Sequence, residues 1–178
     1  RLPLTLEIVH LPKSMRNFHG SCFASCNSLK EVTVDPDNPW FCSIDDVVYT
    51  KDQKELVFYP PGKVDVEFVI PEGCSTIGRY AFAYCEKLTS ITLPKSLTAI
   101  RSSAFEGCSA LKSISVPTGV TVIENRTFYG CISLESIDLP EGLTTIENLA
   151  FRSCAELKNV HIPITVTLLG ATSFSGCS

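Results

Sequence analysis

Features that would point to several common functions are missing from this sequence. No run of about 18 apolar residues occurs, so no transmembrane helix is expected. Basic residues number 15 against 19 acidic ones, and the formal net charge of -4 argues against the positive patch that most nucleic-acid-binding proteins need. The chain also contains no CxxC pair, no HExxH sequence and no glycine-rich phosphate loop. We therefore expect no membrane insertion, no nucleic-acid partner, no metal, no cofactor and no catalytic residues.

The first residues lack a secretion signal. They read RLPLTLEIVHLP, without an initiator methionine and without the long apolar stretch of a cleavable signal peptide. We therefore expect the chain to begin inside a larger precursor.

A repeat of constant length runs through the chain, and its period is the distance from Phe82 to Phe105. An aromatic residue followed three places later by a cysteine recurs at this spacing as Phe82/Cys85, Phe105/Cys108, Phe128/Cys131, Phe151/Cys154 and Phe174/Cys177. A unit this short cannot bury its own apolar face and must stack on its neighbours, so the period predicts a solenoid. We expect a single array over 1–178, with divergent N-terminal coils in 1–34, a divergent coil in 35–63 and regular repeats in 64–178.

One repeat unit predicts the path of a coil. The alternating aliphatic residues of 88–93 suit a short parallel strand, which Pro94 ends. Residues 95–100 predict a turn and a second short extended piece. Residues 101–108 have apolar positions at helical spacing, with Gly107 near their end, and predict a short helical turn.

The nine cysteines do not have the spacing of a disulfide framework. The five repeat cysteines and Cys26 share one repeat position, and such positions lie about 5 Å apart on neighbouring coils, so they should form a ladder. We favour buried free thiols over axial disulfides, and zinc would need four ligands that converge on one point. Cys22, Cys42 and Cys74 lie outside the ladder and are the better candidates for a bridge.

One coil carries an insertion. Leu29 and Asp65 occupy equivalent positions 36 residues apart, 13 more than one period. Two β-rich runs, 47–50 and 56–59, flank a polar link and predict an antiparallel hairpin that projects from the solenoid or replaces its helical turn. Trp40 and Phe41 beside the hairpin have two interpretations: a binding surface, or packing of the hairpin onto the coils, which we favour.

The repeat unit LTSITLPKSLTAIRSSAFEGCSA resembles the BspA-type leucine-rich repeat, a 23-residue class also found in treponemal proteins. The stretch NPWFCSIDDVVYTKDQKELVFYPPGK resembles the hairpin coil that interrupts such arrays, with Asp46 and Gln53 where this family commonly has glycine. The resemblance implies a mainly β, right-handed solenoid with short parallel strands on the concave face, helical turns on the convex face and one inserted β-hairpin. It also implies a secreted or cell-surface protein that adheres to host matrix proteins or to other cells.

The concave face supplies the candidate partner-binding residues, because strand residues between the core leucines face this surface in leucine-rich coils. They are Thr89, Ser90, Thr92, Lys112, Ser113, Ser115, Glu135, Ser136, Asp138, Lys158, Asn159 and His161. Their small polar and charged side chains, with no aromatic residue, favour a protein partner bound through hydrogen bonds and charge. Trp40, Tyr49 and Phe58 on the hairpin are further candidate contacts.

Three of these residues, Ser115, Asp138 and His161, share one position on successive strands. A nucleophilic triad needs the histidine between the serine and the acid, whereas here the aspartate lies in the middle. Ser115 and His161 would also be about 10 Å apart, so we interpret Asp138 and His161 as a surface pair. Two functions stay open: a protein-binding module that is not an enzyme, and passive spacer repeats within a larger surface protein.

Both ends of the array are expected to be open. The chain stops at Ser178, one step before the next strand would begin, and it starts with a degenerate strand at Leu6. Uncovered strand edges favour pairing with another chain. We expect either a longer array or end-to-end self-association with a second copy.

Overall fold

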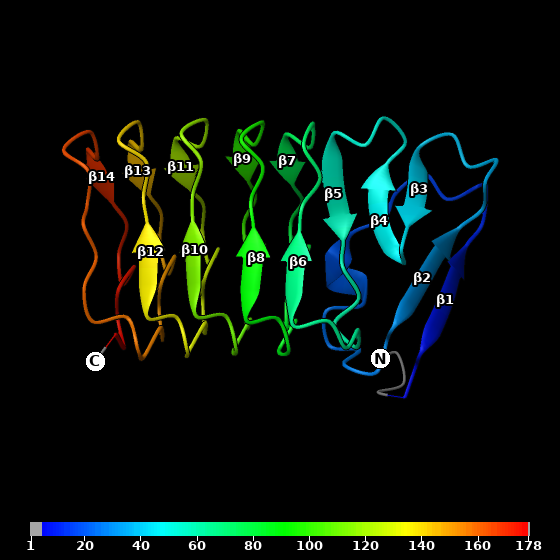
Figure 1. Cartoon of the computed structure of the whole chain (residues 1–178), viewed down its shortest axis with the longest axis horizontal. Helices are drawn as coiled ribbons and strands as arrows, with labels where there is room; N and C mark the ends of the chain where they lie inside the picture. The colour runs from blue at the N-terminus through cyan, green and yellow to red at the C-terminus, as the bar shows by residue number, and fades with distance from the viewer. Residues whose placement is uncertain (1–4, 178) are drawn as a thin grey trace.

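The computed structural model describes residues 5–177 and shows a β-solenoid whose coils stack along one axis (Figure 1). This confirms the predicted leucine-rich-repeat type of solenoid. One parallel sheet, the front sheet, contains β6 (Glu67–Val69), β8 (Ser90–Thr92), β10 (Ser113–Ser115) and β12 (Ser136–Asp138). Its register follows the repeat, since Ile114 pairs with Ile137, one period further along the chain.

A second row of two-residue strands lies behind the front sheet (Figure 1). It contains β7 (Thr76–Ile77), β9 (Ala99–Ile100), β11 (Val122–Ile123), β13 (Thr145–Ile146) and β14 (Leu168–Leu169). The isoleucine that ends each of the first four strands is buried. The second aliphatic register of the sequence therefore forms the inner side of this row.

The third side of each coil consists of turns, and the predicted helical turns are wrong. The one helix among residues 5–177 is a single 3₁₀ turn, η1 (Gly20–Cys22), and no helix in this range is long and apolar enough to cross a membrane. In each regular coil two residues four apart have positive φ, for example Ser103 at 58° and Gly107 at 72°. Right-handed helices do not accommodate such residues. The helical spacing of Phe105 and Cys108 instead comes from consecutive turns that bury both side chains.

The core is organised around an aromatic ladder, which consists of Tyr59, Phe82, Phe105, Phe128, Phe151 and Phe174. Consecutive rings stack with centroids 5.0 to 5.3 Å apart. From Tyr59 to Phe151, each ladder amide also donates to a carbonyl of the next coil, at 2.8 to 2.9 Å. Tyr59 was not anticipated in this role, although it lies one period before Phe82.

Five repeat cysteines form a thiol ladder beside the aromatic one: Cys85, Cys108, Cys131, Cys154 and Cys177. Cys26 was expected in the same ladder but is buried in the separate N-terminal core. Each ladder thiol donates to the carbonyl oxygen of the ladder aromatic in the preceding coil, with Sγ to oxygen distances of 3.1 to 3.7 Å. Burial raises the pKa of the Cys108 and Cys154 thiols to about 12. The ladder cysteines are therefore held as neutral hydrogen-bond donors.

The cysteines outside the thiol ladder form no bridge, because all nine cysteines of the chain are free. Cys22 is exposed, whereas Cys42 and Cys74 turn their thiols toward the carbonyls of Thr50 (3.5 Å) and Thr76 (3.3 Å). These three candidates for a bridge are therefore free thiols in the structure.

The N-terminal coils keep the repeat in a shorter sheet. Strands β1 (Ile8–Leu11) and β2 (Glu31–Val34) pair in parallel with Ile8 opposite Glu31, again one period apart. They cover a second, smaller core in which Phe18 contacts the rings of Phe41 and Phe58.

The insertion forms three antiparallel strands, β3 (Phe41–Ile44), β4 (Val47–Thr50) and β5 (Glu55–Phe58). The predicted hairpin is confirmed as β4 and β5, whereas β3 was not predicted. A two-residue turn joins β3 to β4, and its residues Asp45 and Asp46 have φ of 49° and 67°, as a type I′ turn requires. Gln53 also has positive φ, so both positions that resemble family glycines adopt a glycine-like conformation.

This hairpin separates the two cores. Its residues facing the core of the regular coils are Val47, Tyr49 and Leu56, and those facing the N-terminal core are Val48, Val57 and Phe58. Strand β5 also pairs in parallel with β7, so it extends the second row of strands. We had expected the hairpin to project from the solenoid or to replace a rear turn, and it does neither.

Truncation of one ladder ring should test this core. We expect Phe128→Ala, in the middle of the array, to lower the free energy of unfolding by roughly 3 to 5 kcal/mol, because it removes a fully buried ring and both of its stacking contacts. Denaturant melts of the two proteins measure this difference. A loss below about 1 kcal/mol would show that the ring contributes little to the core.

Thiol labelling should distinguish the cysteines by position. In native protein at pH 8, a thiol reagent should modify exposed Cys22 at once and leave Cys108 and Cys131 unmodified until the protein unfolds, because burial raises the pKa of both thiols. Mass spectrometry of the labelled peptides measures the order. Labelling of Cys131 at the rate of Cys22 would contradict the buried thiol ladder.

Candidate functional site

The front sheet collects most of the predicted partner-binding residues on one face. From Thr89 to Asp138, nine of them lie on β8, β10 and β12 or directly before these strands, and their side chains are exposed or half-exposed. The central residue of each strand, such as Ile114, is buried. Because strand side chains alternate between faces, the polar neighbours of these isoleucines point outward. That a partner binds there stays a prediction.

The remaining three predicted residues, Lys158, Asn159 and His161, do not belong to a strand in the structure. The front sheet ends at β12, and within residues 5–177 no backbone hydrogen bond joins these three residues to it. The imidazole Nε2 of His161 lies 4.0 Å from Oε1 of Glu141. The interpretation of Asp138 and His161 as a surface pair is therefore wrong.

A hollow of about 340 Å³ lies over β8 and β10. Its lining includes the hydroxyls of Ser90, Thr92, Ser113 and Ser115 together with Lys95. These groups can donate and accept hydrogen bonds, and the ammonium adds a positive charge. Ile91, Leu93, Ile114 and Pro117 complete the lining, so the hollow combines polar and apolar surface.

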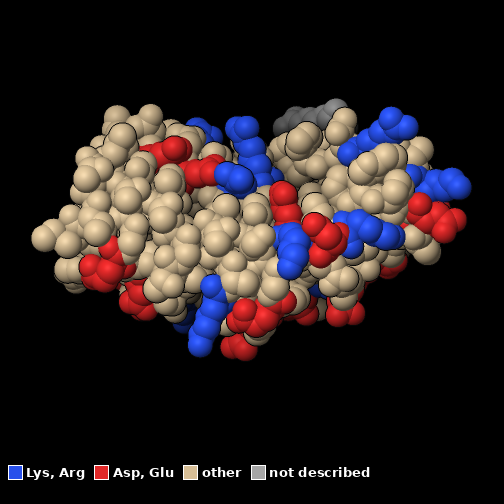
Figure 2. All heavy atoms as spheres, turned by 90° about the horizontal axis from the view of Figure 1, so that it is seen from above, with Lys and Arg blue, Asp and Glu red and all other residues tan. Residues whose placement is uncertain are grey.

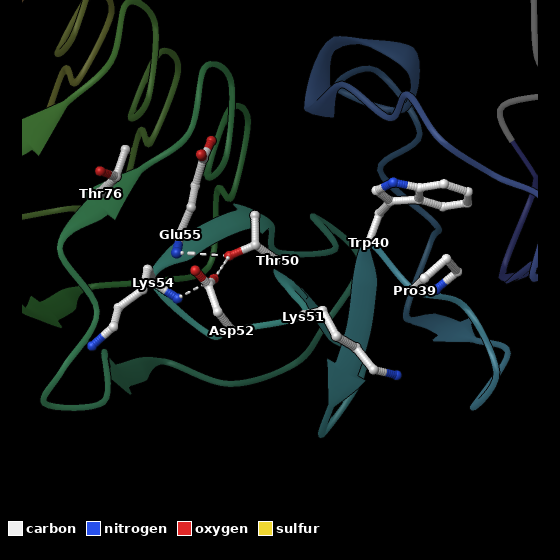
Figure 3. A pocket seen from close by; sticks show the side chains of 8 residues that line it. All are labelled: Pro39, Trp40, Thr50, Lys51, Asp52, Lys54, Glu55 and Thr76. Atoms are coloured by element: carbon white, nitrogen blue, oxygen red, sulfur yellow. Dashed lines mark hydrogen bonds between the residues drawn. The ribbon is translucent and has the colours of Figure 1, made fainter.

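A second cavity, of about 430 Å³, lies beside the hairpin (Figure 3). It is lined by Pro39, Trp40, Thr50, Lys51, Asp52, Lys54, Glu55 and Thr76. Trp40 and Glu55 point to the same side, with Thr50 between them (Figure 3). The Thr50 hydroxyl donates to Asp52 (2.7 Å) and accepts from the Glu55 amide (3.0 Å), which fixes the turn between β4 and β5.

Charge in this second cavity is mixed. Burial raises the pKa of the Glu55 carboxyl, and the positive charge of Arg101 offsets part of this effect. The guanidinium of Arg16 lies over the Trp40 ring, 5.2 Å from its centre. Trp40 keeps 39% of its surface exposed and remains a candidate contact. Glu55 and Thr76 line the same cavity, and neither was predicted from the sequence. The pairing of Glu55 with Thr76 across β5 and β7 has no sequence signal, because the insertion breaks the period there.

The other two predicted hairpin contacts are inaccessible. Tyr49 is 4% exposed and Phe58 is fully buried, each in one of the two cores that the hairpin separates. The prediction that they contact a partner is therefore wrong.

Charged side chains of both signs intermingle over the surface seen from above, and the C-terminal end has few of either (Figure 2). At this end the exposed apolar residues are Ile162, Ile164, Leu168 and Leu169. End-to-end association with a second copy through this surface stays a prediction. No group of three or more His, Cys, Asp or Glu side chains within residues 5–177 could hold a metal ion.

Sequence comparison identifies the repeat. Residues 4–49 and 57–178 match the BspA type leucine rich repeat region, in six copies. No curated protein matches the sequence.

Several solved structures are similar to the chain. A leucine rich cell surface protein from Faecalibacterium prausnitzii A2-165 is 35% identical, with a TM-score of 0.89 over 97% of this chain and 46% of that one. The pneumococcal vaccine antigen PcpA is 32% identical, with a TM-score of 0.61 over 93% of this chain and 35% of that one. The T. pallidum leucine rich repeat protein is 28% identical, with a TM-score of 0.67 over 83% of this chain and 68% of that one. The chain thus spans less than half the length of the first two.

Proposed function

Because the chain belongs to the family of BspA-type leucine-rich repeat regions, we propose that it is a protein-binding module, not an enzyme, within a secreted or cell-surface protein. The observation that carries this proposal is the continuous polar face on β8, β10 and β12. Repeat proteins present such extended faces to macromolecular partners, since stacking fixes the spacing of equivalent side chains.

The composition of the face supports a protein partner. Equivalent positions on successive coils carry Thr89, Lys112 and Glu135, so the face has both a basic and an acidic side chain, and the neighbouring serines offer hydrogen bonds. Charge complementarity of this kind contributes specificity and association rate more than raw affinity. We propose a host matrix protein or another cell-surface protein as the partner, with adhesion as the role.

The location is proposed from the similar proteins. One of them is described as a cell surface protein and another as a vaccine antigen. Both descriptions favour display outside the cell for this repeat region as well.

Charge reversal on the face should test the proposal. We expect Glu135→Lys with Asp138→Lys to weaken binding to whichever immobilised extracellular-matrix protein binds the chain best by about tenfold, which corresponds to about 1.4 kcal/mol. Both carboxylates are exposed, so the melting temperature should change little. Surface plasmon resonance and thermal melts measure the two effects.

The matched control makes the same change in net charge elsewhere. Asp37 and Glu86 are exposed and lie outside β8, β10 and β12, so Asp37→Lys with Glu86→Lys should leave the affinity unchanged. Equal affinities for all three proteins would contradict binding through the front sheet. Failure of every matrix protein to bind would favour passive spacer repeats.

A further inference from the structure

The front sheet has an unpaired edge in the interior of the chain. Its strand order is β12-β10-β8-β6, so it ends at β6, whereas β2, the front strand of the preceding coil, pairs with β1 in a separate sheet. The three strands of the insertion lie between β2 and β6 along the chain and extend the second row of strands instead. Within residues 5–177, no backbone hydrogen bond joins β6 to β2.

The register shows which backbone groups of β6 are available. In a parallel ladder, alternate residues direct their N–H and C=O groups to opposite sides of the strand. The Val66 carbonyl accepts from the Thr89 amide, and the Ile70 amide donates to the Thr92 carbonyl. The even-numbered residues of this segment therefore direct their backbone groups toward β8. Glu67 and Val69 alternate with these residues and direct their backbone groups to the open side.

The side chains of this edge are unusually apolar for the front sheet. Val64, Val66 and Val69 are 74%, 57% and 67% exposed. The positions equivalent to Val66 and Val69 in the next coil are Thr89 and Thr92, and the following coils also carry polar residues there. The apolar side chains therefore coincide with the open edge of β6.

A cavity of about 170 Å³ lies at the end of this edge. Ile44 of β3 and the turn residues Gln53 and Lys54 line one side, and Pro71 and Gly73, just after β6, line the other. The volume holds a single large side chain, and the lining combines the carboxylates of Asp52 and Glu72 with the ammonium of Lys54.

We propose that the open edge of β6, together with this cavity, binds an extended segment of a partner protein as an added strand. Backbone hydrogen bonds to Glu67 and Val69 supply affinity, and the cavity takes one side chain of the segment, as in other strand-addition complexes. The surface differs from the polar face on β8 to β12, so either one can fail without the other.

The charged side chains at the edge of β6 indicate which kind of segment would bind there. Glu67 faces solvent on β6, and Asp65 precedes it, although Asp65 has Lys63 at 3.7 Å. Opposite charges on neighbouring strands are favourable and like charges are not. The structure therefore favours a segment that alternates aliphatic and basic residues. It disfavours a second copy of β6, which would bring its own Glu67 to the contact.

Calorimetric titration of the full chain with two synthetic peptides tests the proposal. One blocked decapeptide alternates valine and lysine, and the other alternates valine and glutamate. We expect the lysine peptide to bind and the glutamate peptide not to bind. N-methylation of alternate residues of the lysine peptide should abolish binding, because it removes the donors that pair with β6. Binding of the methylated peptide as tightly as the parent would overturn strand addition.

Substitution of Glu67 should reverse the preference between the two peptides. Glu67→Lys should weaken the lysine peptide at least tenfold and allow the glutamate peptide to bind. Glu86→Lys makes the same charge change on an exposed turn outside β6 and the polar face and should alter neither. Equal effects of the two substitutions would show that the peptide senses net charge and not this edge.

Val69→Pro tests the direction of the Val69 amide. Proline is tolerated on an edge where its missing N–H faces solvent. We expect an unchanged melting temperature and at least a tenfold weaker lysine peptide. A drop of several degrees would show that this amide is bonded within the fold and would overturn the open edge. Concentration-dependent dimers that Val69→Pro abolishes, with no peptide bound, would make a second copy the occupant and overturn the proposed chemistry.

Discussion

The contact between one ladder aromatic and the next is the interaction on which the rest of the structure depends. At Phe128, for example, three links join neighbouring coils: a ring stack with centroids 5.3 Å apart, an amide that donates to Ala150, and a carbonyl that accepts the Cys154 thiol. An aromatic pair contributes about 0.5 to 1.5 kcal/mol beyond the burial of its area, and each hydrogen bond about 1 kcal/mol. Because the same links recur in every regular coil, the front strands and the polar face keep a fixed spacing.

The insertion interrupts the front sheet, and the aromatic ladder begins directly after it, at Tyr59. Tyr59 keeps the register of the repeat and stacks on Phe82, so the regular coils begin on an unbroken core. The hairpin before it is buried on both faces, as its nearly continuous apolar runs indicate. The extra strands therefore join two cores, and β6 is left with a neighbour on one side only. The polar face therefore lies where the repeat is regular, and the open edge of β6 lies where the insertion interrupts it.

Much of the fold could be predicted because residues at equivalent positions of the repeat are buried to the same extent. The period gave the parallel strands and the buried Phe and Cys positions, and alternation gave the exposed face from Thr89 to Asp138. The rear turns were mistaken for helices because positive φ occurs there at Ser103 and Arg126, which have no glycine signal. Tyr49 and Phe58 were mistaken for contacts, since an aperiodic segment gives no indication of which face is buried.

Native-state hydrogen exchange tests the central claim most directly. Each ladder amide donates to the next coil, so the amides of Phe105, Phe128 and Phe151 should be among the slowest to exchange, with rates set by unfolding of the whole array. The Phe174 amide, at the last coil, should exchange faster. Exchange of the Phe128 amide as fast as that of exposed turns such as Thr118 and Gly119 would show that contacts between coils do not hold the solenoid together.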